Sequence, residues 1–211
     1  MNLRRLIVAA ALSITGLGTA AAAEFVRGGW STEAQYLGLT SFDAPARDLT
    51  VTSPNGLIGL RFSGVNLSVS GPTPLSGKHL EVETLSELLW APDSTAFAIT
   101  SSEGGAVGTW SVAVYRVRDG AIIEPAKAAL KAFAREYPNC PHEYPNAGAA
   151  GWSKGSTFIH LVVEMPCHSS CADMCRFRGY VVNSASGQIV ERLSESEVRK
   201  RWGFGKKVSV K

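Results

Sequence analysis

The sequence has few of the short motifs that identify the common catalytic classes. Gly-x-Ser-x-Gly occurs once, as Gly151-Trp152-Ser153-Lys154-Gly155, but an apolar run typical of a strand follows it, whereas the nucleophile turn of the hydrolases leads into a helix. Gly28-Gly29 and Gly104-Gly105 have neither the spacing nor the following Lys of a phosphate-binding loop. A Cys-x-x-Cys pair, typical of zinc and redox sites, is also absent. We therefore assign no catalytic residue and no cofactor, and favour a non-enzymatic role while the enzymatic alternative stays open.

The chain also lacks a large excess of charge of either sign. Without Arg4 and Arg5, which lie in an N-terminal segment treated below, 19 of the 21 basic residues remain against 18 acidic ones. This near-neutral balance excludes nucleic acid as a partner held by bulk charge. From residue 199 onward, however, there are six basic residues and no acid: Arg199, Lys200, Arg201, Lys206, Lys207 and Lys211. Residues 203–211 are thus a basic tail, either solvated or in contact with an acidic surface such as anionic lipid.

The third missing feature is a long apolar run. The longest candidate, residues 6–17, is shorter than the roughly 20 apolar residues that a membrane-spanning helix needs. Arg4 and Arg5 precede it, and Ala21-Ala22-Ala23 supply the small residues that a signal peptidase requires. We predict that residues 1–23 are a cleaved signal peptide, with a retained anchor as the alternative. The product would be exported, periplasmic or secreted, with no transmembrane segment and with one β-rich domain over residues 24–202.

Cysteine is scarce but clustered. Cys167, Cys171 and Cys175 lie within nine residues, and Cys140 is the fourth. In an oxidising compartment an even number of cysteines favours disulfides. If the segments around the cluster are paired strands, Cys167 and Cys175 lie on opposite sides of their connecting loop, and Cys171 is free to meet Cys140. We therefore favour the pairs Cys167 with Cys175 and Cys140 with Cys171, while Cys140 with Cys167 or with Cys175 stays open.

The alternative interpretation of the same residues is a metal site. Thiolates with a nearby imidazole suit Cu(I) or Zn(II). The candidate ligands are Cys140, His142, Cys167, His168, Cys171 and Cys175, with Met174 close by. Neither common spacing of such sites is complete, and no Lys or Arg adjoins Cys171 to lower the pKa of its thiol. Disulfides are therefore preferred to metal or thiol chemistry.

Short apolar runs separated by Gly, Pro, Asn, Asp and Ser predict many short strands, and these runs repeat. Trp90-Ala91-Pro92-Asp93-Ser94 leads into an apolar run, a polar loop, a second run over residues 110–117 and the turn at 118–120. Trp152-Ser153-Lys154-Gly155-Ser156 leads into the same order, with runs at 157–165 and 177–182 and a turn at Ser186-Gly187. A third copy without the Trp begins at Ser53-Pro54-Asn55-Gly56.

These repeats resemble those of the TolB-type β-propeller, a relative of the WD-repeat proteins. The signature of that family is a Trp-Ser-Pro-Asp-Gly turn between the first two strands of a blade. The resemblance covers about residues 48–193 and implies antiparallel sheets resembling propeller blades, in which the turn residues are structural. Closed propellers have at least four blades, whereas about three repeats are present here. We therefore expect a mainly β fold that is either a partial or open propeller, completed by a second copy, or a sandwich.

Two short helices complete the predicted fold. Pro125 suits a first helical turn, and apolar residues recur at helical spacing until Pro138. This predicts a helix over 125–137. Ser194 with Glu197 forms a Ser-x-x-Glu capping box for a second helix that ends at about Trp202, before Gly203. Of the other histidines, His160 lies in an apolar run and is interpreted as a hydrogen-bonded strand residue.

Two functional hypotheses follow from the sequence. The first is an exported, non-enzymatic module of propeller-like repeats that binds a protein or cell-envelope partner through its loops, with a homo-oligomer as one arrangement. The second is a periplasmic protein that binds Cu or Zn, or uses reactive thiols, at the 167–175 loop. We favour the first.

Overall fold

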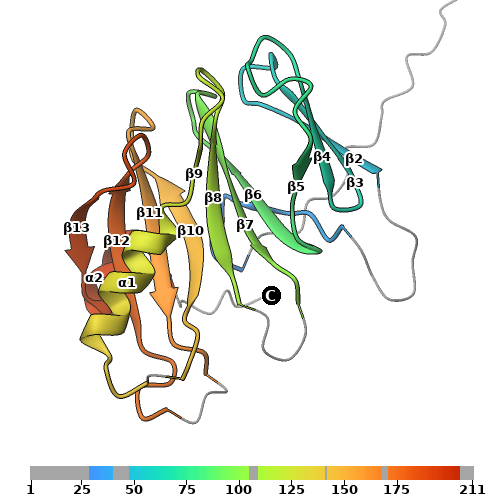
Figure 1. Ribbon diagram of the computed structural model, residues 1–211. Helices are drawn as coiled ribbons and strands as arrows, with labels where there is room; N and C mark the ends of the chain where they lie inside the picture. Colours follow the sequence, from blue (N-terminus) through green and yellow to red (C-terminus); the bar gives the residue numbers. More distant parts are fainter. Residues whose placement is uncertain (1–28, 40–47, 105–108, 141, 168–170, 205–211) are drawn as a thin grey trace, which may run out of the picture.

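The computed structural model describes residues 29–39, 48–104, 109–140, 142–167 and 171–204. They form a mainly β structure of three antiparallel sheets and two short helices (Figure 1). The predicted signal peptide and most of the basic tail lie outside these ranges. Within the ranges, none of the helices has both the length and the apolar character needed to cross a membrane.

Each sheet is built from strands that follow one another along the chain. The first sheet contains β2 (Asp48–Thr52), β3 (Gly59–Ser63), β4 (Asn66–Ser70) and β5 (Leu80–Glu81). The middle sheet contains β6 (Leu85–Trp90), β7 (Ala96–Ser102), β8 (Ser111–Arg116) and β9 (Ile122–Ile123), with β1 (Gln35–Tyr36) added beside β6. The third sheet contains β10 (Asn146–Trp152), β11 (Phe158–Glu164), β12 (Phe177–Asn183) and β13 (Ile189–Leu193).

The three sheets stack face to face (Figure 1). One apolar core lies between the first and middle sheets, where Phe62 of β3 shares a cluster with Phe97 and Ile99 of β7. A second core lies between the middle and third sheets and joins Ala98 of β7 to Leu161 of β11. Successive side chains of a strand point to opposite faces of its sheet. β7 therefore contributes to both cores, which explains why almost all of its residues are buried.

The two outer faces of the stack differ in how they meet solvent. The outer face of the first sheet is exposed and polar, with Thr50, Arg61 and Ser68 side by side in register. The outer face of the third sheet is covered by α2 (Glu195–Trp202), whose fully buried Val198 packs over Gly179 of β12. A Cβ atom on Gly179 would press against Val198 and Trp202. Neither end of the stack therefore leaves a bare apolar sheet face.

Both helices occur where the sequence predicts them. α1 (Ala126–Glu136) begins after Pro125 and buries Ala126, Ala129, Ala132 and Phe133 in the core between the middle and third sheets. α2 has the predicted capping box, in which Ser194 and Glu197 bond to each other's backbone N–H. Gly203 ends α2 in the left-handed conformation, with φ of 70°, which glycine adopts without steric cost.

The segment before β1 ties the stack together. The backbone N–H groups of Gly29 and Trp30 donate hydrogen bonds of 2.6 and 3.2 Å to the carboxylate of Glu87 on β6. The Trp30 ring lies over Gly148 of β10, where a Cβ atom would overlap it. The same ring contacts the ring of Phe204, at 6.1 Å between centroids. One short segment thus contacts both the middle and the third sheet.

Candidate functional site

The candidate site lies at the end of the stack where the turns of all three sheets meet. The turn between the first two strands is built in the same way in each sheet. Its first residue, Ser53, Ala91 or Ser153, donates its N–H to the carbonyl five residues on and accepts from the N–H three residues on. The latter residue has positive φ in each copy: 75° at Gly56, 62° at Ser94 and 57° at Ser156. The three turns are therefore structurally equivalent, including the one that lacks the preceding Trp.

The turns between the last two strands of the middle and third sheets are equivalent too. The backbone carbonyl of Arg116 accepts a hydrogen bond from the N–H of Gly120, four residues on, and that of Asn183 accepts one from Gly187 in the same way. Both glycines have positive φ. Asp119 Oδ1 accepts from the N–H of Ala121, just as Ser186 Oγ accepts from that of Gln188. This equivalence places Arg116 and Asn183 at matching positions in neighbouring sheets.

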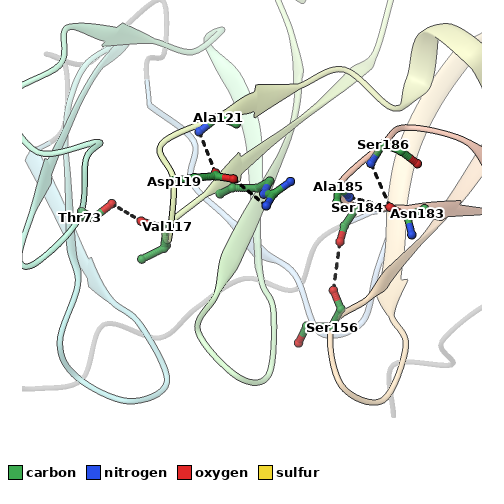
Figure 2. Close-up of polar contacts among 10 residues, drawn as sticks. Thr73, Val117, Asp119, Ala121, Ser156, Asn183, Ser184, Ala185 and Ser186 are labelled. Carbon is green, nitrogen blue, oxygen red and sulfur yellow. Dashed lines mark hydrogen bonds and ion pairs between the residues drawn. The ribbon is translucent and has the colours of Figure 1, made fainter.

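Direct contacts fill the space between the first and middle sheets at this end. The Thr73 hydroxyl donates 2.6 Å to the carbonyl of Val117, and Lys78 Nζ donates 3.0 Å to the carbonyl of Gly120. Figure 2 shows the Thr73 contact beside the Asp119 turn. The long β4–β5 connection supplies both donors. This interface is therefore closed by hydrogen bonds.

The matching space between the middle and third sheets is open. It forms a pocket of about 250 Å³. The middle sheet contributes Thr95, Ala96, Arg116 and Arg118, and the third sheet contributes Gly155, Ser156, Thr157, Asn183, Ser184 and Ala185. The side chains of the short β12–β13 turn form hydrogen bonds within the third sheet, unlike those of Thr73 and Lys78. A Cβ atom at Gly155 would meet nothing within 4 Å. We call this space the inter-sheet pocket.

Two arginines give the inter-sheet pocket its charge. Arg116 is half-buried and forms an ion pair of 2.6 Å with Asp119. Arg118 is exposed, and within the described part of the chain it has no carboxylate within ion-pair distance. Nearby, Asp93 does not line the pocket. Partial burial alone would raise the pKa of Asp93, but hydrogen bonds from the side chain and backbone of Thr95 outweigh this and hold the pKa below its usual range.

The cysteine segment lies apart from this pocket and is crosslinked. Disulfides join Cys140 to Cys171 and Cys167 to Cys175. The first holds the loop between β11 and β12 to the segment that follows α1, and the second closes that loop on itself. Met174 is half-exposed beside them.

The structure gives little support to metal binding by the cysteine segment. The sulfurs of Cys140 and Cys171 lie close to a carboxylate oxygen of Asp173, but a sulfur within a disulfide is not a thiolate, and thiolates are the ligands that zinc and copper prefer. His142 is exposed, and His168 lies outside the described residues. Metal binding at this segment would first require reduction of the disulfides.

His160 lines a separate shallow pocket. Its ring stacks on that of Trp202 of α2, with the centroids 4.7 Å apart and the planes 8° from parallel. Burial, reinforced by the charge of Arg201, holds the pKa of His160 below its usual range. The sequence predicts a hydrogen-bonded histidine in a strand. His160 does lie in a strand, β11, and the contact found for its ring is an aromatic stack.

Comparison with known proteins gives no relative from which a function could be transferred. No family model, no curated protein and no solved structure matches the chain.

The sequence did not point to the arginines and Asn183 of the inter-sheet pocket. A usable signal was present, because Arg116-Val117-Arg118-Asp119-Gly120 and Asn183-Ser184-Ala185-Ser186-Gly187 occupy the same position in two repeats. Aligning the two turns places both runs at one end of adjacent sheets.

Proposed function

We propose that the protein is an exported, non-enzymatic binding module that holds a protein or cell-envelope partner at the turn end of its three-sheet stack. The observation that carries the proposal is the inter-sheet pocket. It is open to solvent, is lined by two arginines and by hydroxyl and amide side chains, and lies on turns held by backbone hydrogen bonds. Side chains that bind partners are commonly carried by loops positioned on a rigid scaffold.

We further propose that the three sheets are degenerate propeller-like blades in an open arrangement. Support comes from the three equivalent turns, which occupy the place of the Trp-Ser-Pro-Asp-Gly turn, and from the order of strands in each sheet. In this arrangement adjacent blades present their turns at one end, as in Figure 1. One outer face of the stack is polar and the other is covered by α2, so the blades need not close into a complete propeller to cover an apolar face.

Export is part of the proposal. Its support is the apolar segment followed by Ala21-Ala22-Ala23 and the presence of two disulfides, which persist in oxidising compartments. An N-terminal sequence of the protein recovered outside the cytoplasm tests this step. The expected first residue is Glu24.

Binding at the turn end is tested by co-sedimentation with isolated cell envelopes of the source organism. The test variant replaces Arg118 and Lys154, both exposed at this end, by alanine. The matched control is Arg61→Ala on the outer face of the first sheet, where Arg61 is also exposed and pairs with Asp48. We expect the test variant to lose at least about 80% of the bound fraction, since charge-assisted contacts contribute about 1.5–3 kcal/mol each. Equal binding by the two variants would contradict the proposal.

A further inference from the structure

The inter-sheet pocket has a hydrogen-bonding character that selects a class of ligand. Its Asn183 side chain shows this most clearly. The Asn183 carbonyl oxygen Oδ1 accepts from the N–H groups of Ala185 and Ser186, each at 2.9 Å (Figure 2). An amide oxygen has two lone pairs, and both are therefore engaged. What Asn183 can still offer a ligand is its NH₂ group, which only donates.

Two hydroxyl groups on the same side, those of Ser184 and Thr157, use their protons within the third sheet. The Ser184 hydroxyl shares its one proton between the carbonyl of Thr157, at 2.9 Å, and that of Ser156, at 3.2 Å. Thr157 Oγ1 donates to the carbonyl of Gly155 at 3.3 Å. These bonds occupy carbonyl acceptors along the pocket wall. They also hold the backbone of the two turns in place.

Donors remain on the side of the middle sheet. A guanidinium has five N–H donors and no acceptor. Arg116 uses part of its set on Asp119, while the Arg118 guanidinium has no described carboxylate partner. None of the pocket-lining residues is acidic. The free donors of the pocket therefore come from Arg116, Arg118 and the Asn183 amide, and the two guanidinium groups give it positive charge.

We infer that the inter-sheet pocket binds an oxyanion group, a phosphate or a carboxylate carried by the partner. Arg118 is the main charged contact, and Arg116 and the Asn183 amide complete the donor set. Planar guanidinium groups match the oxygens of carboxylate and phosphate. A volume of about 250 Å³ admits such a group together with part of the molecule that bears it. The inference rests on the proposed binding role of the turn end and names the chemistry recognised there.

The test is an NMR titration of the purified chain with inorganic phosphate, acetate and glucose in parallel, at constant ionic strength. We expect saturable shifts of the backbone amides at 155–157 and 183–185 with phosphate or acetate, and none with glucose. The anion that saturates at the lower concentration identifies the group. Absence of saturation by both anions, or saturation by glucose, overturns the inference.

Variants locate the site. Arg118→Ala should weaken binding of the anion by about tenfold or more, because it removes a charge-assisted contact, and Arg118→Lys should weaken it less. Arg61→Ala should leave it unchanged. Arg118 is exposed, so an unchanged amide spectrum away from the pocket will show that the variant is folded. Equal anion affinity of Arg118→Ala and the wild type overturns the inference. Envelope binding with no anion binding overturns the inference and is consistent with the proposed function. Anion binding with no envelope binding supports the inference and contradicts the proposed function.

Discussion

Gly148 is the residue on which the close approach of the N-terminal segment depends. The Trp30 ring occupies the space above it on β10, where any side chain would overlap the indole. Trp30 is buried and also contacts the rings of Trp110 and Phe204. A side chain at position 148 would expel the indole from this cluster.

We predict that Gly148→Ala lowers the free energy of unfolding by about 3 kcal/mol, since overpacking and loss of a buried aromatic both cost energy. Gly151→Ala is the matched control on the same strand. Its Cβ atom would lie 3.6 Å from the His160 ring, so a change under about 1 kcal/mol is expected. Urea unfolding curves measure both. A Gly148→Ala protein as stable as the control would mean that Trp30 does not occupy this position.

Glu87 is a buried carboxylate that binds the N-terminal segment. Burial raises the pKa of its carboxyl, although the N–H groups of Gly29 and Trp30 partly offset this effect. Between the ordinary glutamate pKa of about 4.3 and the raised pKa of the folded chain, Glu87 therefore holds a proton in the folded chain that it has lost in the unfolded chain. The contribution of Glu87 to the free energy of unfolding must then fall as pH rises through the interval between the two pKa values.

A carboxyl ¹³C titration checks this directly. Glu87 should titrate above the ordinary glutamate value. Glu197, whose pKa is lowered by hydrogen bonds from the Ser194 side chain and backbone, should titrate below it. In unfolding experiments, the stability of the wild type relative to Glu87→Gln should be greater at pH 4 than at pH 7. The reverse order would contradict the burial of Glu87.

Among the elements, those with local signals were predictable from the sequence. Pro125 predicted the start of α1, and Ser194 with Glu197 and Gly203 predicted both ends of α2. These signals work because caps are satisfied by residues within a few positions of the helix end. The turns at Ser53, Ala91 and Ser153 were likewise visible as repeats, because the hydrogen bonds that close each turn join residues three to five positions apart.

Elements whose existence depends on distant residues were not predictable in this way. β10 is rich in Ala and Gly, which are weak strand formers, and it is held by β11 and by the middle sheet. The two-residue β1 pairs with β6 some fifty residues later. The inter-sheet pocket is of the same kind, because its two walls come from different repeats.

The disulfides allow a prediction at the scale of the element. Cys140 and Cys171 are 31 residues apart, whereas Cys167 and Cys175 are 8 apart. The entropy of closing a loop in the unfolded chain grows with its length, so we expect Cys140→Ser/Cys171→Ser to cost about 4 kcal/mol and Cys167→Ser/Cys175→Ser about 3 kcal/mol. Unfolding in urea measures the two costs. Peptide mapping without reduction tests the pairing itself, and Cys140 found with Cys167 or Cys175 would contradict it.

At the scale of the whole molecule, the ends of the stack bear on self-association. The outer face of the first sheet is polar, and α2 covers the outer face of the third. Burial of apolar area drives most stable association, and neither face has such area to offer a second copy. We predict a monomer by gel filtration with light scattering over the micromolar range. A concentration-dependent dimer would mean that a second copy completes the stack, as a partial propeller would require.

The central claim is that the turn end is the binding surface. Hydrogen–deuterium exchange of the purified chain, with and without cell envelopes of the source organism, tests it most directly. Slower exchange should appear at the amides of residues 91–95, 117–121, 153–157 and 184–188, and the outer face of the first sheet should not change. Protection confined to that face, or to the disulfide-linked segments around Cys140 and Cys171, would contradict the claim.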